Sequence, residues 1–177
     1  PHERLVRGSL LPAMLESVAG NLRYFDHFRI FELAQVFRKG AMSPSEPEEV
    51  LPLQERSLCA ALVGKDAMEL FREAKGVIEA LPRFAQTRTL RFGQMEKPAW
   101  ADPKMWLNIL GHDGTYIGSL GLLSLQAEHL AGIKHQLTVL FELNVEKLEA
   151  LDSRENKYVA LPLYPEVWQD LNVVVNQ

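Results

Sequence analysis

The sequence contains a single cysteine, Cys59, among its 177 residues. One cysteine excludes a disulfide within the chain, and it also excludes the cysteine clusters of structural zinc sites. The neighbours of Cys59, residues 58 and 60–63, are apolar. This setting is typical of a buried, inert thiol rather than of a catalytic nucleophile.

The sequence also lacks an excess of positive charge. Its formal net charge is −4 and its pI is about 5.8. A surface that holds many nucleic-acid phosphates is usually basic, so the chain as a whole does not fit that class. Arg23, Arg29, Arg38 and Lys39 are predicted to border the first helix and strand as a solvated edge. The three tryptophans are Trp100, Trp106 and Trp168. Because they are scattered, without the pattern of interleaved basic residues that single-strand binders use, we expect them to pack in the protein rather than to stack on nucleic-acid bases.

No signal peptide and no long apolar run is present. We therefore expect a soluble, cytoplasmic protein with no membrane association. The chain begins at Pro1 without a methionine, and it stops just after the apolar run 173–175. From these ends we expect an excised fragment of a longer protein.

Catalytic motifs are missing as well. There is no G-x-S-x-G elbow and no P-loop, and the glycine run 118–121 lacks the dinucleotide-binding spacing, which favours a role in close packing. The five histidines show no metal-ligand spacing: His2, His27, His112, His129 and His135. We therefore predict no catalytic, no cofactor-binding and no metal-binding residue in this chain.

What the sequence does contain is a pattern of strands and amphipathic helices. Apolar spacing predicts a helix over 9–24, with Ser9 as N-cap and Pro12 in its first turn. It also predicts a helix over 67–81, capped by Asp66 and ended by Pro82. Two short helices are predicted over 125–130 and 145–151.

Strands are predicted between these helices. The segment 28–37 alternates in polarity, with a bulge expected near Ala34, and 41–53 reads as an exposed loop. Asp113-Gly114 between two apolar runs predicts a hairpin. The other strands are expected at 58–63, 87–92, 105–110, 116–122 and 136–143. Strands mostly follow strands, so we predict an α+β domain with an antiparallel sheet flanked by helices.

Two carboxylates interrupt apolar strands. Glu32 and Glu142 lie in the matching tripeptides Phe-Glu-Leu of residues 31–33 and 141–143. Such a carboxylate on the core side of a strand could bind Mg²⁺ or an amine. We favour the simpler interpretation, a solvent-facing residue that needs no partner.

Several motifs resemble the beta subunit of phenylalanyl-tRNA synthetase. Residues 7–16 read R-G-S-L-L-P-A-M-L-E, and residues 28–37 read F-R-I-F-E-L-A-Q-V-F. The family is similar, with R-x-S-L-L-P-G-L-L followed by a strand of the type L-F-E-I-G-x-V-F. Further segments resemble the family over nearly the whole chain: 71–76, 116–121, 140–145 and 163–171.

The resemblance implies that residues 1–157 form a degenerate class II synthetase core and that 158–177 begin a ferredoxin-like anticodon-binding domain. It implies a structural, subunit-interface role in an α2β2 phenylalanine–tRNA ligase that charges tRNA-Phe. ATP and magnesium would bind elsewhere in the holoenzyme, and this fragment would bind no cofactor. An exposed apolar patch is expected where the alpha subunit docks.

The resemblance is incomplete in two places. The family's H-P-G-R-S-A reads K-P-A-W-A-D at residues 97–102, and Gln169 stands where the family has arginine. One alternative is a free-standing class II-like enzyme that adenylates an amino acid, with Arg29 as its nearest phosphate-binding arginine. A weaker alternative is a binding module that uses the sheet edge at 173–175.

Overall fold

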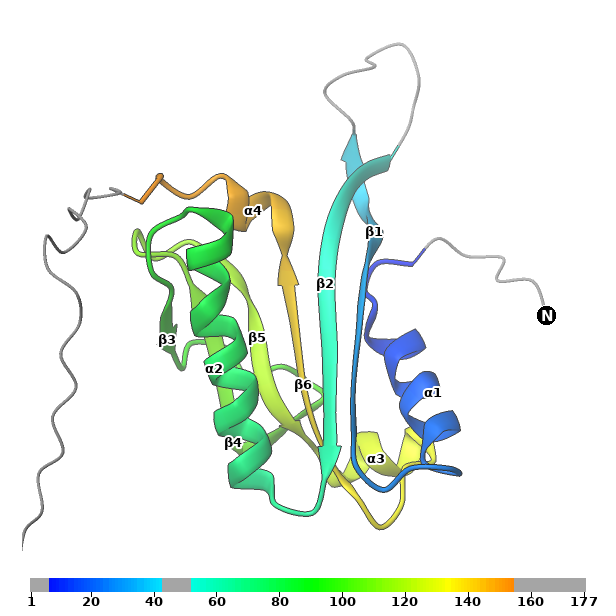
Figure 1. Ribbon diagram of the computed structural model, residues 1–177. Helices are drawn as coiled ribbons and strands as arrows, with labels where there is room; N and C mark the ends of the chain where they lie inside the picture. Colours follow the sequence, from blue (N-terminus) through cyan, green and yellow to red (C-terminus); the bar gives the residue numbers. More distant parts are fainter. Residues whose placement is uncertain (1–6, 43–51, 155–177) are drawn as a thin grey trace, which may run out of the picture.

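The computed structural model describes residues 7–42 and 52–154. Six antiparallel strands form one twisted sheet in the order β1-β2-β6-β5-β4-β3 (Figure 1). The strands are β1 (Phe28–Met42), β2 (Pro52–Gly64), β3 (Arg91–Gly93), β4 (Ala101–Leu110), β5 (Tyr116–Leu123) and β6 (Leu137–Asn144). The predicted antiparallel α+β class is confirmed.

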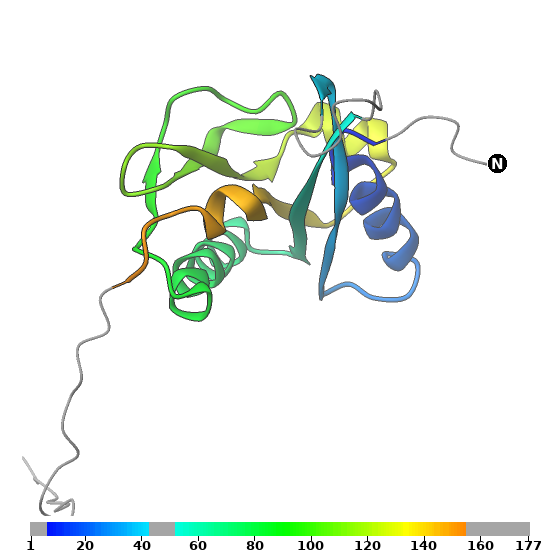
Figure 2. The same cartoon turned by 90° about the horizontal axis from the view of Figure 1, so that it is seen from above.

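Helices cover the sheet from two sides (Figure 2). Helix α2 (Ala67–Ala85) packs on β2, β5 and β6, whereas α1 (Leu11–Asn21) packs on β2 and contacts α3 (Leu125–Ala131). The short helix α4 (Val145–Glu149) follows β6 directly. Because neighbouring residues of a strand face opposite sides, β2 divides its side chains between the two layers.

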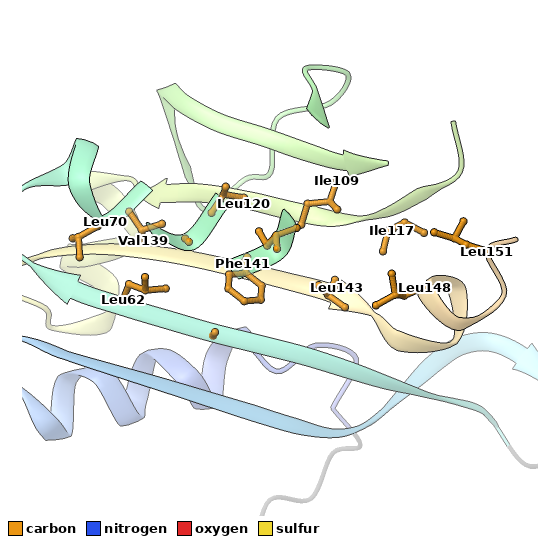
Figure 3. Packing of buried hydrophobic residues seen from close by; sticks show 13 residues of the cluster. Leu62, Leu70, Ile109, Ile117, Leu120, Val139, Phe141, Leu143, Leu148 and Leu151 are labelled. Atoms are coloured by element: carbon orange, nitrogen blue, oxygen red, sulfur yellow. The ribbon is translucent and has the colours of Figure 1, made fainter. Parts of the chain in front are cut away.

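The larger core lies between the sheet and α2 (Figure 3). Leu70, Ala74 and Ile78 recur at four-residue intervals on α2 and are buried against the sheet. The strand residues of this core include Leu62, Ile109, Leu120, Val139, Phe141 and Leu143. The second core joins α1 to the other face through Leu10, Met14, Val18, Cys59, Ala61, Val63 and Leu140.

Several predicted elements are confirmed with small shifts of their ends. Asp66 caps α2, and one of its carboxylate oxygens accepts from the amides of Met68 and Glu69. The β4–β5 hairpin turns at residues 111–115, with Gly114 at φ +86°. The short helices α3 and α4 lie where they were expected.

Other local predictions are wrong. Pro82 does not end α2, because it extends the buried stripe of Leu70, Ala74 and Ile78, and this packing holds the helix to Ala85. No bulge occurs near Ala34: the β1–β2 register is unbroken to Arg38 and shifts only between Arg38 and Met42. The expected strand over 87–92 is reduced to β3 plus a bridge from Thr87 to Ser153.

The two ends of the predicted 41–53 loop belong to strands. β1 reaches Met42, and β2 begins at Pro52 rather than at residue 58. The early part of β2 was missed because its side chains are mostly half-buried or exposed and show no apolar run. Residues 43–51 lie outside the described part of the chain.

The two Phe-Glu-Leu tripeptides lie in register on either side of β2. Glu32 and Glu142 both pair with Cys59, while Phe31 and Phe141 both pair with Ala60. The environments of the two phenylalanines nevertheless differ, since Phe141 is 2% exposed under α2 and Phe31 is 76% exposed on the edge strand.

Candidate functional site

A row of five residues crosses the sheet on the face that carries α1. In strand order it runs Asn108, Ser119, Glu142, Cys59, Glu32, and each residue pairs with the next. Four of the five are polar. This row brings two carboxylates, a thiol, a hydroxyl and an amide together on one face of the sheet.

Glu142 accepts three hydrogen bonds in the middle of this row. The Ser9 hydroxyl donates to Oε2 at 2.7 Å, the Leu10 amide donates to Oε1 at 2.8 Å, and the Ser57 hydroxyl donates to Oε1 at 2.9 Å. The prediction of a solvent-facing Glu142 without a partner is therefore wrong. The carboxylate instead fastens the start of α1 to the sheet.

Ser9 itself is not the N-cap that the sequence predicted. Leu10 occupies that position and has no side-chain cap. Ser9 lies one residue earlier, where its hydroxyl accepts from the Leu11 amide at 3.1 Å and donates to Glu142. Its hydroxyl thus links the helix start to the carboxylate.

Glu32 holds the same N-terminal segment at a second point. Arg7 donates from Nη1 to Glu32 at 2.7 Å and from Nε to the Gln35 carbonyl at 3.2 Å, and the Phe37 amide donates to the Arg7 carbonyl. The Arg7 and Glu32 side chains are about one third exposed. Glu32 is thus partly solvated, as predicted, but it does have a partner.

Cys59 lies between the two carboxylates and is fully buried. Burial raises the pKa of the Cys59 thiol well above its usual range, and the negative charges of Glu142 and Glu32 raise it further. A thiol in this environment stays protonated. The predicted inert, buried cysteine agrees with this geometry.

Asn108, Ser119 and Tyr116 form a second hydrogen-bonded group beside Glu142. Asn108 Nδ2 donates to Ser119 Oγ at 3.2 Å, and the Tyr116 hydroxyl lies 2.7 Å from the same oxygen. The side-chain Oδ1 of Asn108 accepts from the backbone amides of Met95 and Glu96. Asn108 therefore fixes the chain just before residues 97–102 against the sheet.

These residues form the floor of a pocket of about 530 Å³, a size typical of small-molecule sites, which we call the polar pocket after them. Leu11 and Trp100 contribute to its walls, together with residues 95–99. Lys97 is a cation on this wall, and its ammonium donates to the carbonyls of Pro98 and Ala101, each at 3.1 Å. Residues 97–100, the first part of the stretch 97–102 that departs from the resembled family, thus line one side of the pocket.

The glycines of the 118–121 run allow close packing of strands, as predicted. A Cβ on Gly118 would lie 2.1 Å from the carbonyl oxygen of Glu142, and one on Gly121 would lie 2.9 Å from the Ala101 Cβ. Both distances are shorter than real Cβ contacts allow. The run therefore serves the packing of β5 against its neighbours.

An apolar groove of about 310 Å³ lies on the opposite face, between α2 and the edge strand β1. Phe31, Leu58 and Val77 contribute to its lining, and Phe31 and Val77 are 76% and 45% exposed. Leu33, two residues along β1 from Phe31, is 55% exposed. Helix α2 packs on β2, β5 and β6 and leaves Phe31 and Leu33 of β1 exposed.

Arg29 lies at this groove and not in the polar pocket. Its Nε donates to Glu73 at 2.8 Å, and a second bond from Nη2 makes the pair bidentate. The hydrogen bond from Arg29 lowers the pKa of Glu73, and the charge of Arg29 lowers it further. Arg38, on the same strand, pairs with Glu55.

The remaining sequence candidates are dispersed. His112 lies 3.3 Å from Asp152, while Trp100 and Trp106 are half-buried at separate positions. Within residues 7–42 and 52–154, no group of three or more His, Cys, Asp and Glu side chains could hold a metal ion. None of the helices in the same ranges is both long and apolar enough to cross a membrane. Trp168 and Gln169 lie outside the described residues.

The residues that surround Glu142 leave little signal in the sequence. Asn108 and Ser119 each interrupt an apolar strand, as Glu32 and Glu142 do, and this shared signal could have identified them. Ser57 and Ser9 had no such signal, because their partner Glu142 is 85 and 133 residues away along the chain.

Comparison with known proteins identifies the family. A family model described as "Phenylalanyl tRNA synthetase beta chain CLM domain" matches residues 2–145. The chain belongs to this family of synthetase beta chains. The resemblance inferred from the motifs at 7–16 and 28–37 is confirmed.

Curated relatives in the synthetase beta family agree with this assignment. The phenylalanine–tRNA ligase beta subunit of Bacillus licheniformis is 31% identical over 98% of this chain, and that of Bacillus cereus strain ATCC 14579 is 30% identical over 97%. The chain spans about 22% of the length of each of these relatives.

Solved structures with a similar fold also include synthetases. The structure of Desulfitobacterium hafniense PylSc, a pyrrolysyl tRNA synthetase, matches with a TM-score of 0.63 and 16% identity, over 80% of this chain and 48% of that one. A crystal structure of pyrrolysyl-tRNA synthetase from the same organism has a TM-score of 0.62. The class II synthetase-like architecture predicted for this beta chain is therefore confirmed as a fold.

Proposed function

We propose that this chain is the structural and subunit-interface part of a phenylalanine–tRNA ligase beta subunit, and that it carries out no catalysis itself. The observation that carries the proposal is the family match over residues 2–145. The complete ligase would use ATP and magnesium to charge tRNA-Phe, as a cytoplasmic α2β2 heterotetramer. Residues 1–157 would be its catalytic-like domain, and 158–177 would begin an anticodon-binding domain.

The chemistry of the polar pocket supports a non-catalytic role. Activation of an amino acid by ATP needs cations that neutralise the phosphates in the transition state. Lys97, a cation of the pocket wall, is bound to two backbone carbonyls. Glu142, the carboxylate of the floor, accepts from Ser9, Leu10 and Ser57 and so fastens α1 to the sheet.

The apolar groove supports an interface role. Phe31 and Leu33 expose large apolar side chains on β1. The residues that match them in register on β6 are buried. Such a patch is typical of a protein–protein contact. We propose that the alpha subunit docks at this groove, which is the apolar patch expected from the sequence.

The experiment is a co-purification of the full-length beta subunit with its alpha subunit, followed by light scattering. The variant Phe31→Ser/Leu33→Ser should weaken assembly by at least roughly thirtyfold, because truncation of buried interface residues typically costs about 2–4 kcal/mol. Leu130→Ser is the matched control, since Leu130 is 80% exposed in α3, away from the groove. Assembly of the double variant as tight as that of the wild type would rule out this groove.

The alternative of a free-standing adenylating enzyme is tested separately by titration with Mg²⁺ and ATP. Arg29 was its candidate phosphate ligand, and this residue is engaged with Glu73 on the face opposite the polar pocket. We expect no saturable ATP binding to the chain. Tight binding that is lost in Arg29→Ala would favour the enzyme over the scaffold.

A further inference from the structure

A small polar cavity of about 130 Å³ lies where β5 and β6 meet α4. It is separate from the α2 groove, and it shares Tyr116 and Glu142 with the larger pocket. Its lining also includes Asn144, Lys147 and Arg38. The cavity is therefore bordered by two cations, one carboxylate and a side-chain amide.

Asn144 is 6% exposed, so its side-chain amide is almost entirely removed from solvent. Its Oδ1 accepts from the Lys147 amide at 2.8 Å, which caps α4. Its buried Nδ2 has no hydrogen-bond partner among the described residues. A buried donor without an acceptor is unfavourable, and buried polar groups in folded proteins are nearly always paired. The position therefore favours a bound group that accepts hydrogen bonds.

The charges around the cavity indicate which acceptor would suit it. Lys147 donates from Nζ to the Tyr116 carbonyl at 3.3 Å, and Arg38 is paired with Glu55. Glu142 opposes these cations, but three neutral donors already surround its oxygens. An anion that accepts from Asn144 would be placed beside the two positive side chains.

We propose that this cavity binds a small free oxyanion, such as phosphate or a short carboxylate, through Asn144 Nδ2, Lys147 and Arg38. The volume suits a group of a few heavy atoms and is too small for a nucleotide. The competing occupant is a small group of water molecules. Water binding would not depend on the identity of the anion in solution, which makes the two cases separable.

The test uses full-length protein labelled with ¹⁵N-asparagine and follows the Asn144 side-chain amide by NMR, assigned by its loss in Asn144→Asp. Phosphate, sulfate and acetate are titrated at constant ionic strength against chloride. We expect a saturable shift with phosphate at a Kd of about 1–10 mM, and none with chloride. No saturation with any of the three probes up to roughly 100 mM would overturn the proposal and leave a water-filled cavity.

Two variants sharpen the result. Lys147→Gln should weaken phosphate binding about threefold, because Lys147 is solvent-exposed and its charge is partly screened. Lys75→Gln, which removes an exposed lysine paired with Glu79 on α2, is the matched control and should change nothing. Equal weakening by both substitutions would indicate a general charge effect and would contradict a specific site. Neither outcome depends on whether the alpha subunit binds the groove.

Discussion

The side chain of Glu142 joins parts of the chain that are 132 residues apart at its contact with Leu10. Together with Glu32 and its partner Arg7, it holds the segment before α1 across the sheet. Two of the motif residues that resembled the synthetase beta family, Arg7 and Ser9, are the partners of these carboxylates. These two motif residues therefore have a structural role, because they attach the start of α1 to the sheet.

Substitution of Glu142 should reduce stability according to the acceptors it removes. Glu142→Ala leaves the Ser9 hydroxyl and the Leu10 amide without this acceptor and leaves Ser57 with only its longer bond to the Leu143 carbonyl, so the free energy of unfolding should fall by about 3 kcal/mol. Glu142→Gln keeps one acceptor oxygen and should cost about 1 kcal/mol. Urea unfolding of the chain measures both. Glu149→Gln, which removes a solvent-exposed pair with Arg56, should stay within about 0.5 kcal/mol; an equal loss there would contradict the assignment.

Cys59 should make stability fall at alkaline pH. Burial and the charges of Glu142 and Glu32 raise its pKa in the folded chain, so the folded state keeps the proton while the unfolded state loses it above about pH 8.5. Ionisation of Cys59 therefore leaves the free energy of unfolding unchanged below that pH. Above it, the free energy of unfolding decreases by up to about 1.4 kcal/mol per pH unit.

The alkaline effect of Cys59 is measured by urea unfolding between pH 8 and pH 10, with Cys59→Ala as the comparison. The alanine variant is expected to be less stable at pH 8 because it leaves a cavity. Its stability should then decline less steeply with pH than that of the wild type. Identical slopes for the two proteins would show that Cys59 does not titrate between the folded and unfolded states.

Two glycines in different elements should respond oppositely to alanine. In β5, Gly118→Ala places a Cβ 2.1 Å from the Glu142 carbonyl oxygen and 2.7 Å from the Leu143 Cα, so the strands must separate, and we expect a loss of about 3 kcal/mol or more. In α2, a Cβ at Gly76 meets nothing within 4 Å, and alanine should stabilise by about 0.5–1 kcal/mol. Thermal unfolding of both variants tests the pair, and a stable Gly118→Ala variant would contradict the packing.

The elements also show which parts of the fold are visible in sequence. Helix α2 and the β4–β5 hairpin were predicted because their signals are local: an N-cap at Asp66, apolar spacing and the Asp113-Gly114 turn. The end of α2 was missed because tertiary packing of Pro82 outweighs its intrinsic preference to stop a helix. The surroundings of Glu142 were missed for the same kind of reason, since Ser9, Leu10 and Ser57 reach it only through contacts between parts of the chain that are 85 to 133 residues apart.

At the scale of the whole molecule, we expect the two Phe-Glu-Leu tripeptides to have different roles, one in folding and one in assembly. They occupy matching register positions beside β2, but α2 covers one and leaves the other exposed. Two similar sequences in similar local structure thus meet different surroundings. If the chain is an interface module of the synthetase, the exposed copy should matter for association and the buried copy for stability.

This contrast predicts opposite results for two phenylalanines in the isolated chain. Phe141→Ala should lower the free energy of unfolding by about 3–5 kcal/mol, because Phe141 is 2% exposed in the main core. Phe31→Ser should change it by no more than about 0.5 kcal/mol, because that side chain is already 76% exposed. Urea unfolding gives both values. Strong destabilisation by Phe31→Ser would mean that the groove residue supports the fold itself, and weaker assembly of its variants would then no longer indicate docking.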